Sequence, residues 1–432
     1  MTESMVHLNH KTQQRMLSRI LAFLCFTILI AACQPPAAER LGSHLPAAEI
    51  LGKPGYTAIS FGGYRHASRD TVPTIAELKE DLAILRAMGI KVLRTYNTQQ
   101  FGETANLLEA IKQMKDADPT FEMYVMLGAW INRKDAFTAN PDHTQEDADN
   151  NKAEIDTAVS MANAYPDIVK VIAVGNEAMV HWAASYFVEP GIILKWVKHL
   201  RQLRDDKKLP ADIWITSSDN FASWGGGDSS YFKPDLDSLI KAVDYISMHT
   251  YPFHDSHYNP AYWQVPATEK SLPATQQISA AMDRAANYAK TQYQSVQAYV
   301  KRLGVSKPIH IGETGWASVD THLYGAEGSK AADEYKQKLY YDHLRAWTDS
   351  AGIACFFFEA FDEPLKDARN VNGSENHFGL INIQGEAKYA LWSMVDQGVF
   401  KGLTRNGRAI GKTFGGDSTA LLSSILPPAL AK

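Results

Sequence analysis

Short apolar runs and amphipathic helical stretches alternate eight times along this chain, between Tyr56 and Asp396. The run Ile168–Val174 is representative, because it is rich in β-branched residues and too short for a buried helix. Such a run predicts a strand covered on both faces, as in parallel sheets. Eight strand–helix units with no linker between them predict a single closed (β/α)8 barrel, a TIM barrel, with long loops after some strands.

The alternation assigns residues 55–400 to the barrel domain and leaves residues 401–432 as a C-terminal tail without assigned structure. The expected strands are Tyr56–Phe61, Ile90–Tyr96, Phe121–Leu127, Ile168–Val174, Ile213–Ser217, Tyr245–His249, Ile309–Gly312 and Ile353–Phe358. The expected helices are Thr74–Met88, Gly102–Lys115, Asn151–Ala164, Ile192–Leu203, Leu236–Ala242, Thr275–Arg302, Ala331–Trp347 and Ala387–Asp396. No G-x-G-x-x-G motif follows the first strand, which argues against a dinucleotide-binding sheet.

The N-terminus has the pattern of a targeting segment. Basic residues precede the apolar stretch Ile20–Ala32, which is shorter than the roughly 20 residues that a membrane-spanning helix needs. The residues Ile-Ala-Ala-Cys that end in Cys33 resemble a bacterial lipobox, so we expect residues 1–32 to be a lipoprotein signal peptide and Cys33 to carry lipid. Because Gln34 follows, sorting to the outer membrane of a Gram-negative cell envelope is favoured. A plain secretory peptide is the alternative. Residues 33–54, rich in Pro and Ala, are then a tether.

Charge and cysteine usage narrow the possible partners. The formal net charge is −5, and removal of three basic residues and one acidic residue with the signal peptide makes it −7, so no basic surface for nucleic acid is expected. Of the three cysteines, Cys25 leaves with the signal peptide and Cys33 is the expected anchor. Cys355 then has no disulfide partner and is expected to be a small buried apolar residue. We expect a monomer that contacts a membrane through its lipid anchor only.

Two of the expected strands end in a glutamate. Glu177 follows the fourth strand after Gly-Asn, and Glu313 follows the seventh strand after Gly. Active sites of barrels lie at the carboxyl ends of the strands, so both carboxyl groups are expected at one mouth. Two carboxyl groups across a cleft are what glycoside hydrolysis requires, since one protonates the leaving oxygen and the other attacks the sugar or activates water. A structural ion pair or a helix cap is the alternative for each residue alone.

Three segments together resemble glycoside hydrolase family 17, the β-1,3-glucanase family: GNE at 175–177, IGETGWAS at 311–318 and FFFEAFDEPLK at 356–366. The resemblance implies a retaining double displacement on a laminarin-like β-1,3-glucan, with Glu177 as acid/base and Glu313 as nucleophile. It also implies that Asn176 binds the sugar 2-hydroxyl and that Tyr251 lies near the nucleophile. It further implies that Glu363 and Lys366 contact sugar hydroxyls, and Glu375 resembles another glutamate of the same loop.

Several aromatic residues are candidate sugar platforms, because an apolar sugar face packs on an aromatic ring. Trp316, close to Glu313 in the sequence, is the first candidate for a wall of the site, and Tyr64 and Tyr96 end the first two strands. Packing within loops is the alternative for the remaining tryptophans of this kind, which are Trp130, Trp224 and Trp263.

No metal or other cofactor is expected. His249, His254 and His257 lie close together in the sequence, but no carboxylate pattern completes a metal site around them. Two other functions use the same residues. A β-1,3-glucan transglycosylase has the same two glutamates and passes the sugar to a hydroxyl instead of water. A non-catalytic glycan-binding surface lipoprotein is the second alternative, but such a protein needs neither glutamate.

Overall fold

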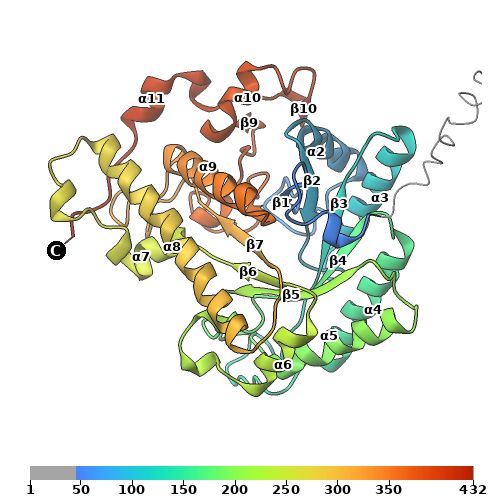
Figure 1. Ribbon diagram of the computed structural model, residues 1–432. Helices are drawn as coiled ribbons and strands as arrows, with labels where there is room; N and C mark the ends of the chain where they lie inside the picture. Colours follow the sequence, from blue (N-terminus) through green and yellow to red (C-terminus); the bar gives the residue numbers. More distant parts are fainter. Residues whose placement is uncertain (1–44, 432) are drawn as a thin grey trace, which may run out of the picture. The chain divides into compact units, whose positions relative to one another are not determined.

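Eight parallel strands close into a barrel in which each strand is hydrogen-bonded to its sequence neighbours and β1 pairs with β8 (Figure 1). The structure is a computed structural model that describes residues 45–431. The barrel strands are β1 (Thr57–Ser60), β2 (Ile90–Arg94), β3 (Tyr124–Ala129), β4 (Val169–Asn176), β5 (Trp214–Asn220), β6 (Ile246–His249), β7 (Ile309–Gly315) and β8 (Cys355–Phe358). The predicted (β/α)8 barrel is therefore confirmed.

Helices follow the strands and cover the outside of the barrel (Figure 1). The longer ones are α2 (Ile75–Ala87), α3 (Glu103–Ala117), α4 (Ala148–Ala164), α5 (Pro190–Asp205), α6 (Pro234–Ala242), α8 (Ala274–Arg302) and α9 (Glu334–Ala351). The shorter ones are α7 (Pro252–Tyr258), α10 (Trp392–Asp396) and α11 (Ser418–Ser423). Among the described residues, no helix has both the length and the apolar character needed to cross a bilayer.

The last predicted helix, Ala387–Asp396, is only partly present. The chain there forms the short strand β9 (Glu386–Ala387), a 3-10 turn and then α10. Lys388 is extended and 2% exposed, and its ammonium donates to Asp362 at 2.7 Å. This buried ion pair holds Lys388 out of a helix, which explains the shorter α10.

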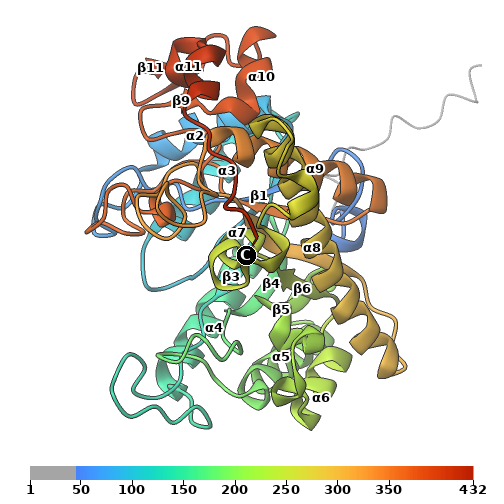
Figure 2. The ribbon, with the colours of Figure 1, turned by 90° about the vertical axis from the view of Figure 1, so that its left-hand side faces the viewer.

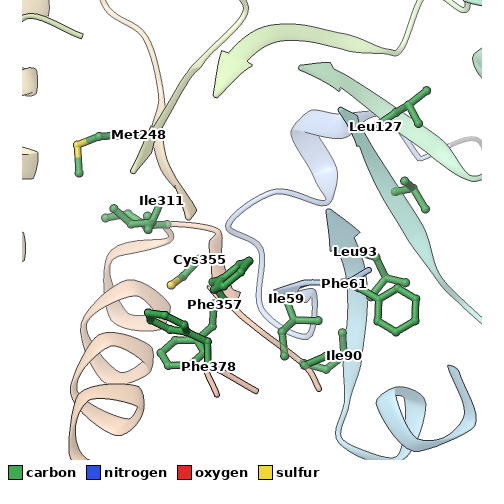
Figure 3. Packing of buried hydrophobic residues seen from close by; sticks show 14 of the residues in the cluster. Ile59, Phe61, Ile90, Leu93, Leu127, Met248, Ile311, Cys355, Phe357 and Phe378 are labelled. Carbon is green, nitrogen blue, oxygen red and sulfur yellow. The ribbon is translucent and has the colours of Figure 1, made fainter. Parts of the chain in front are cut away.

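Alternation along the strands divides the core into two layers, because successive side chains of a strand point to opposite faces. Ile59, Leu93, Leu127, Ile311 and Phe357 belong to the outer layer between strands and helices (Figure 3). Their neighbours point into the barrel, where the inner cluster includes Ala58, Val92, Met126 and Phe356. The inner cluster is apolar, so it fills the barrel below the carboxyl ends of the strands.

Residues 45–54 are not part of a tether, and the predicted boundary at residue 54 is wrong. The 3-10 turn η1 (Ala47–Glu49) begins the folded domain, and Ala47, Ile50 and Leu51 are buried in the inner cluster of the barrel. Their apolar side chains remain on the barrel because that contact removes them from water. The predicted signal peptide, Cys33 and the rest of the predicted tether lie outside the described residues.

The C-terminal segment has structure that its sequence pattern did not predict. Its elements are β10 (Thr404–Arg405), β11 (Arg408–Ala409), β12 (Gly411–Lys412) and α11, and they lie beside α2 and α9 (Figures 1 and 2). Arg405 is fully buried and its Nε donates to Asp81 of α2 at 2.9 Å. Such ion pairs and short strands have no hydrophobic period, so the sequence pattern does not reveal them.

Candidate active site

The turn after β4 presents Glu177 at the carboxyl end of the barrel. Gly175 and Glu177 both have positive φ angles, +79° and +47°. A glutamate rarely adopts this left-handed backbone, which is found most often at functional sites and needs support from its surroundings. The Glu177 amide donates to the Ser218 carbonyl of β5 at 3.0 Å, and its carboxyl Oε1 lies 3.1 Å from Nδ1 of His249.

Glu313 lies within β7 and receives hydrogen bonds from three residues at the ends of two other strands, β2 and β6. The hydroxyl of Tyr251, after β6, donates to Oε1 at 2.6 Å, and the hydroxyl of Tyr96, after β2, donates to Oε2 at 3.0 Å. The guanidinium of Arg94, the last residue of β2, also donates to Oε2. The side chain of Glu313 is 10% exposed, so it is held by these donors and still reaches solvent.

The two glutamates have opposite electrostatic environments. Burial raises the pKa of Glu177 to about 8, and the negative charge of Glu313 adds to this effect. Burial also acts upward on Glu313, but the charge of Arg94 and the tyrosine hydroxyls outweigh it and lower the pKa of Glu313 to about 2. At neutral pH the first carboxyl group keeps its proton and the second is ionised. A pair separated in this way can act as an acid and a nucleophile.

Arg94 is a site residue that the sequence analysis did not identify. Its guanidinium is 2% exposed and donates to Oδ1 of Asn176 at 2.5 Å, in addition to Glu313. Asn176 precedes Glu177, so Arg94 links the two strand ends that carry the glutamates. Its position at the end of an apolar strand was the signal, since a charged residue that points into a barrel needs a buried partner.

The loop after β8 brings the predicted pair Glu363 and Lys366 to the same end of the barrel. Oε1 of Glu363 accepts the backbone N–H of Tyr64 at 2.9 Å, and Lys366 Nζ lies 3.4 Å from Oε2 of Glu363. A Cβ at Gly62 would lie 2.4 Å from Oε1 of Glu363, so this close approach requires glycine. The ammonium of Lys366 also lies 5.3 Å from the centre of the ring of Tyr96, whose hydroxyl donates to Glu313.

Two further acids belong to the β8 loop. Glu359, one residue after β8, is 1% exposed and its Oε1 has no hydrogen-bond partner among the described residues. Burial, followed by the charge of Glu363, raises the pKa of Glu359 well above its usual value. Glu375 lies further along the same loop, in the 3-10 turn Ser374–Asn376, where its residue is exposed. It interacts electrostatically with Glu177 and Lys366.

Two of the predicted substrate contacts are wrong. Trp316 is fully buried, and its indole N–H donates to the Ala331 carbonyl at 2.8 Å. Its side chain belongs to the outer core layer, so it is not a wall of the site. Tyr64 is 4% exposed and its hydroxyl donates to Glu103 of α3 at 2.9 Å, so its backbone amide serves the site and its ring does not. The core also contains Trp224 and Trp263.

Trp130 is the tryptophan candidate that remains near the surface. It is half-buried after β3, and its ring lies 5.4 Å from that of Tyr186 in the loop after β4. The ring of Tyr186 lies 5.7 Å from that of Phe137, which is 66% exposed. Tyr186 lies in the loop that begins with Glu177, and burial and then the charge of Glu177 raise the pKa of Tyr186. Tyr186 and Phe137 were not identified from the sequence because their loops have no period.

His249 has a different partner from the other two histidines, which both lie beside Tyr324. His249 contacts Glu177, whereas Nδ1 of His254 lies 3.0 Å from the Tyr324 hydroxyl and His257 packs on Tyr258. Within residues 45–431 no group of three or more His, Cys, Asp and Glu side chains is arranged to hold a metal ion. Cys355 is free and buried, in agreement with its predicted role in the core.

Residues 58–379 match the model of the BtgE/BtgC glycoside hydrolase domain. The chain belongs to this family. The matched BtgE/BtgC domain contains β1 to β8, both glutamates and the loop after β8. The chain is therefore a glycoside hydrolase, and the two carboxyl groups form its candidate catalytic pair.

Known relatives of this BtgE/BtgC hydrolase agree with the fold and the enzyme class. A crystal structure of an endo-laminarinase from Formosa Hel1_33_131 is 57% identical, covers 90% of this chain and 98% of its own, and has a TM-score of 0.88. A glucan 1,3-beta-glucosidase from Arthroderma benhamiae is 26% identical over 73% of this chain and 83% of its own length. A family 17 β-1,3-glucanosyltransferase from Rhizomucor miehei is 18% identical over 78% of this chain and 96% of its own, with a TM-score of 0.54, and shows the fold alone.

Proposed function

We propose that this chain hydrolyses β-1,3-glucan with retention of configuration, as a member of glycoside hydrolase family 17. The observation that carries the proposal is that Glu177 and Glu313 lie at one end of the barrel and that Glu313 accepts hydrogen bonds from Arg94 and two tyrosine hydroxyls, which favour its ionised form. The similarity to an endo-laminarinase over nearly the whole of that chain supports β-1,3-glucan as the substrate.

In the first step, the ionised carboxylate of Glu313 attacks the anomeric carbon and Glu177 gives its proton to the leaving glycosidic oxygen. A covalent glycosyl-enzyme forms and the shortened glucan leaves. The negative charge of Glu313 is lost on bond formation, so the pKa of Glu177 falls and its carboxylate is able to take a proton from water. The resulting hydroxide attacks the anomeric carbon, which releases Glu313 and gives the β product.

The residues around Glu313 keep it ready for this attack. Arg94 and Tyr251 stabilise its charge before the reaction, and their positions on β2 and after β6 fix the direction of its oxygens. Asn176 accepts from Arg94 and keeps its amide N–H groups for the substrate, where the 2-hydroxyl of the sugar is the expected partner. Lys366, which lies beside the buried Glu363, presents an ammonium group for other hydroxyls of the same glucan.

The stereochemistry of the product tests this mechanism. Proton NMR during digestion of laminarin is expected to show the β anomer first, as in retaining enzymes whose carboxyl groups are about 5–5.5 Å apart. Early release of the α anomer would show that Glu313 activates water, and the double displacement would be wrong.

Two matched variants then separate the roles of the glutamates. Glu313→Ala is expected to lose the covalent step, and added azide is expected to give an α-glycosyl azide from an activated β substrate. Glu177→Ala is expected to lose activity on laminarin but to keep the first step with a good leaving group, and azide should then give the β-glycosyl azide. The reverse pattern would exchange the two assignments.

Transfer to a sugar acceptor is the second candidate function. Leaving group and acceptor both enter on the side of the acid/base. The aromatic group of Trp130, Tyr186 and Phe137 lies in the loops after β3 and β4, and Glu177 directly follows β4. Rings in this place favour binding of a sugar acceptor. Mass analysis of the products from a defined laminari-oligosaccharide decides between the two, since hydrolysis gives only shorter chains and transfer also gives longer ones.

A further inference from the structure

His249 is a buried histidine that lies between the two glutamates. It ends β6, its partner in the register with β7 is Glu313, and its side chain is 0% exposed. Nδ1 lies 3.1 Å from Oε1 of Glu177, and Nε2 lies 2.8 Å from Oγ of Ser218. Both ring nitrogens therefore have partners, and the ring plane is fixed from two sides.

The surroundings of His249 determine its charge. Burial lowers the pKa of His249 to about 4, and the groups that face it are Glu313 from β7, Arg94 from β2 and Asp219 from β5, in addition to Glu177. The carboxyl groups favour the imidazolium and Arg94 opposes it, but burial dominates. The ring is neutral at neutral pH, so it has one N–H group and one acceptor nitrogen.

The partners of the two nitrogens determine which of them carries the hydrogen. Ser218 Oγ is a hydroxyl that can donate to Nε2, and it has a second hydroxyl neighbour in Ser247 at 2.9 Å. The carboxylate that Glu177 becomes during catalysis can only accept. A ring with hydrogen on Nδ1 satisfies both neighbours in every step, whereas the other tautomer leaves two acceptors facing each other once Glu177 has lost its proton.

We propose that His249 is a positioning residue for the acid/base: Nδ1–H donates to Oε1 of Glu177 and so keeps the catalytic proton on Oε2. This inference rests on the proposed role of Glu177. The hydrogen bond persists when the proton leaves, and it then becomes stronger because its acceptor is charged. His249 thus favours proton transfer to the leaving group and partly offsets the repulsion between the two carboxylates.

Two amide substitutions each keep one of the two hydrogen bonds of the His249 ring and remove the other. His249→Asn places an N–H donor near the position of Nδ1 and keeps the contact with Glu177, whereas His249→Gln reaches the position of Nε2 and keeps the contact with Ser218. If His249 positions the acid, His249→Gln loses a hydrogen bond to the charged form of Glu177. The pKa of Glu177 then rises, and the alkaline limit of kcat/KM moves up by about one pH unit.

The expected kinetic result has two further parts. In His249→Gln, kcat on laminarin falls about tenfold or more with little change in KM, and the loss is smaller for an aryl glucoside whose leaving group needs no proton. His249→Asn is expected to restore most of both effects. Equal losses in the two variants, or an unmoved alkaline limit in a folded His249→Gln protein, would overturn the proposal, and thermal melting establishes that each variant is folded.

A measurement on the unaltered protein covers the case in which neither variant folds. Nitrogen-15 NMR of the histidine rings identifies tautomers, and buried rings exchange their hydrogen slowly with solvent. His249 and His310 are both buried, but Nδ1 of His310 accepts the Ala354 N–H, so a slowly exchanging hydrogen on Nδ1 identifies His249. Hydrogen on Nδ1 agrees with the proposal, and hydrogen on Nε2 overturns it. Glu177→Gln distinguishes a failure of the proposed function from a failure of the role of His249. If Glu177→Gln retains full activity, the proposed function is wrong. If Glu177→Gln is inactive and His249→Gln behaves like the unaltered enzyme, only the role of His249 is wrong.

Discussion

Arg94 on β2 donates from its guanidinium to Glu313 on β7, although 219 positions separate the two residues in the sequence. The same side chain donates to Asn176, the residue before Glu177. One buried cation therefore contacts the proposed nucleophile and the strand end that carries the proposed acid. Loss of this cation leaves the charge of Glu313 without its main partner, and that loss is costly in a buried site.

Replacement of Arg94 should raise the pKa of Glu313. In Arg94→Met, burial acts on Glu313 without its counter-charge, so the acidic limit of kcat/KM moves to higher pH and kcat/KM falls about 10²-fold or more at neutral pH. Arg94→Lys keeps the charge and is the matched control, with a smaller shift. A pH profile of the Met variant that superimposes on that of the unaltered enzyme would contradict this role.

Activity should fall on both sides of a broad pH range. The active form has Glu313 ionised and Glu177 protonated. Activity is lost as pH falls through the depressed pKa of Glu313, and it is lost as pH rises through the raised pKa of Glu177, about 8. Initial rates on laminarin between pH 1 and pH 10, a range that extends beyond both values, measure both limits, after brief incubation at each pH to establish that the enzyme survives. An alkaline limit near the ordinary pKa of a glutamate would contradict the protonated state of Glu177.

Trp316 and Trp130 should respond differently to substitution. Trp316→Ala removes a fully buried ring, so it lowers the free energy of unfolding by about 3–5 kcal/mol and leaves the KM of the remaining folded enzyme unchanged. Trp130→Ala removes a half-buried ring that contacts Tyr186 in the loop after β4, and it should weaken substrate or acceptor binding by about 1 kcal/mol with a smaller effect on stability. Denaturant titration and KM measurements on both variants test the contrast, and a Trp316 variant of normal stability but raised KM would reverse it.

We propose that Cys33 anchors the protein in the cell envelope. Cys33→Ser removes the thiol that would carry lipid, so metabolic labelling with a radioactive fatty acid and membrane association should both be lost. The whole chain, expressed in a Gram-negative host, is fractionated beside the variant. If the serine variant stays in the membrane fraction and its labelling is unchanged, the lipid anchor is wrong.

Those parts of the fold that depend on local pattern were predictable from the sequence. The buried strand Val169–Asn176 and the strand that contains Glu313 are apolar runs, and their order along the chain is also their order in the barrel. Because barrel strands are parallel, their carboxyl ends share one rim, and this rule alone brings Glu177 and Glu313 together.

Contacts across the barrel were not predictable, because they depend on register. Arg94 and His249 point into the barrel toward glutamates on other strands, and their own segments do not indicate which residues these partners are. Trp316 is the opposite case, because it is close to a glutamate in the sequence but does not reach the site. A register shift between Ile311 and Thr314 interrupts the alternation of side chains along β7, and Thr314 contacts Tyr340 of α9 on the outer face. Trp316 follows Thr314 by two positions and also lies outside, although it is close in sequence to Glu313.

The contact between Glu363 and the backbone of Tyr64 joins residues 299 positions apart, where the first and last strands of the barrel meet. These strands share one register pair, Ile59 with Phe357. Closing so long a loop costs entropy that only the finished contacts can offset. During synthesis, β8 and the β8 loop leave the ribosome after almost all of the barrel. The nascent chain therefore already contains both catalytic carboxyl groups before the last strand closes the barrel, and Glu363 and Lys366 complete the sugar site only with that closure.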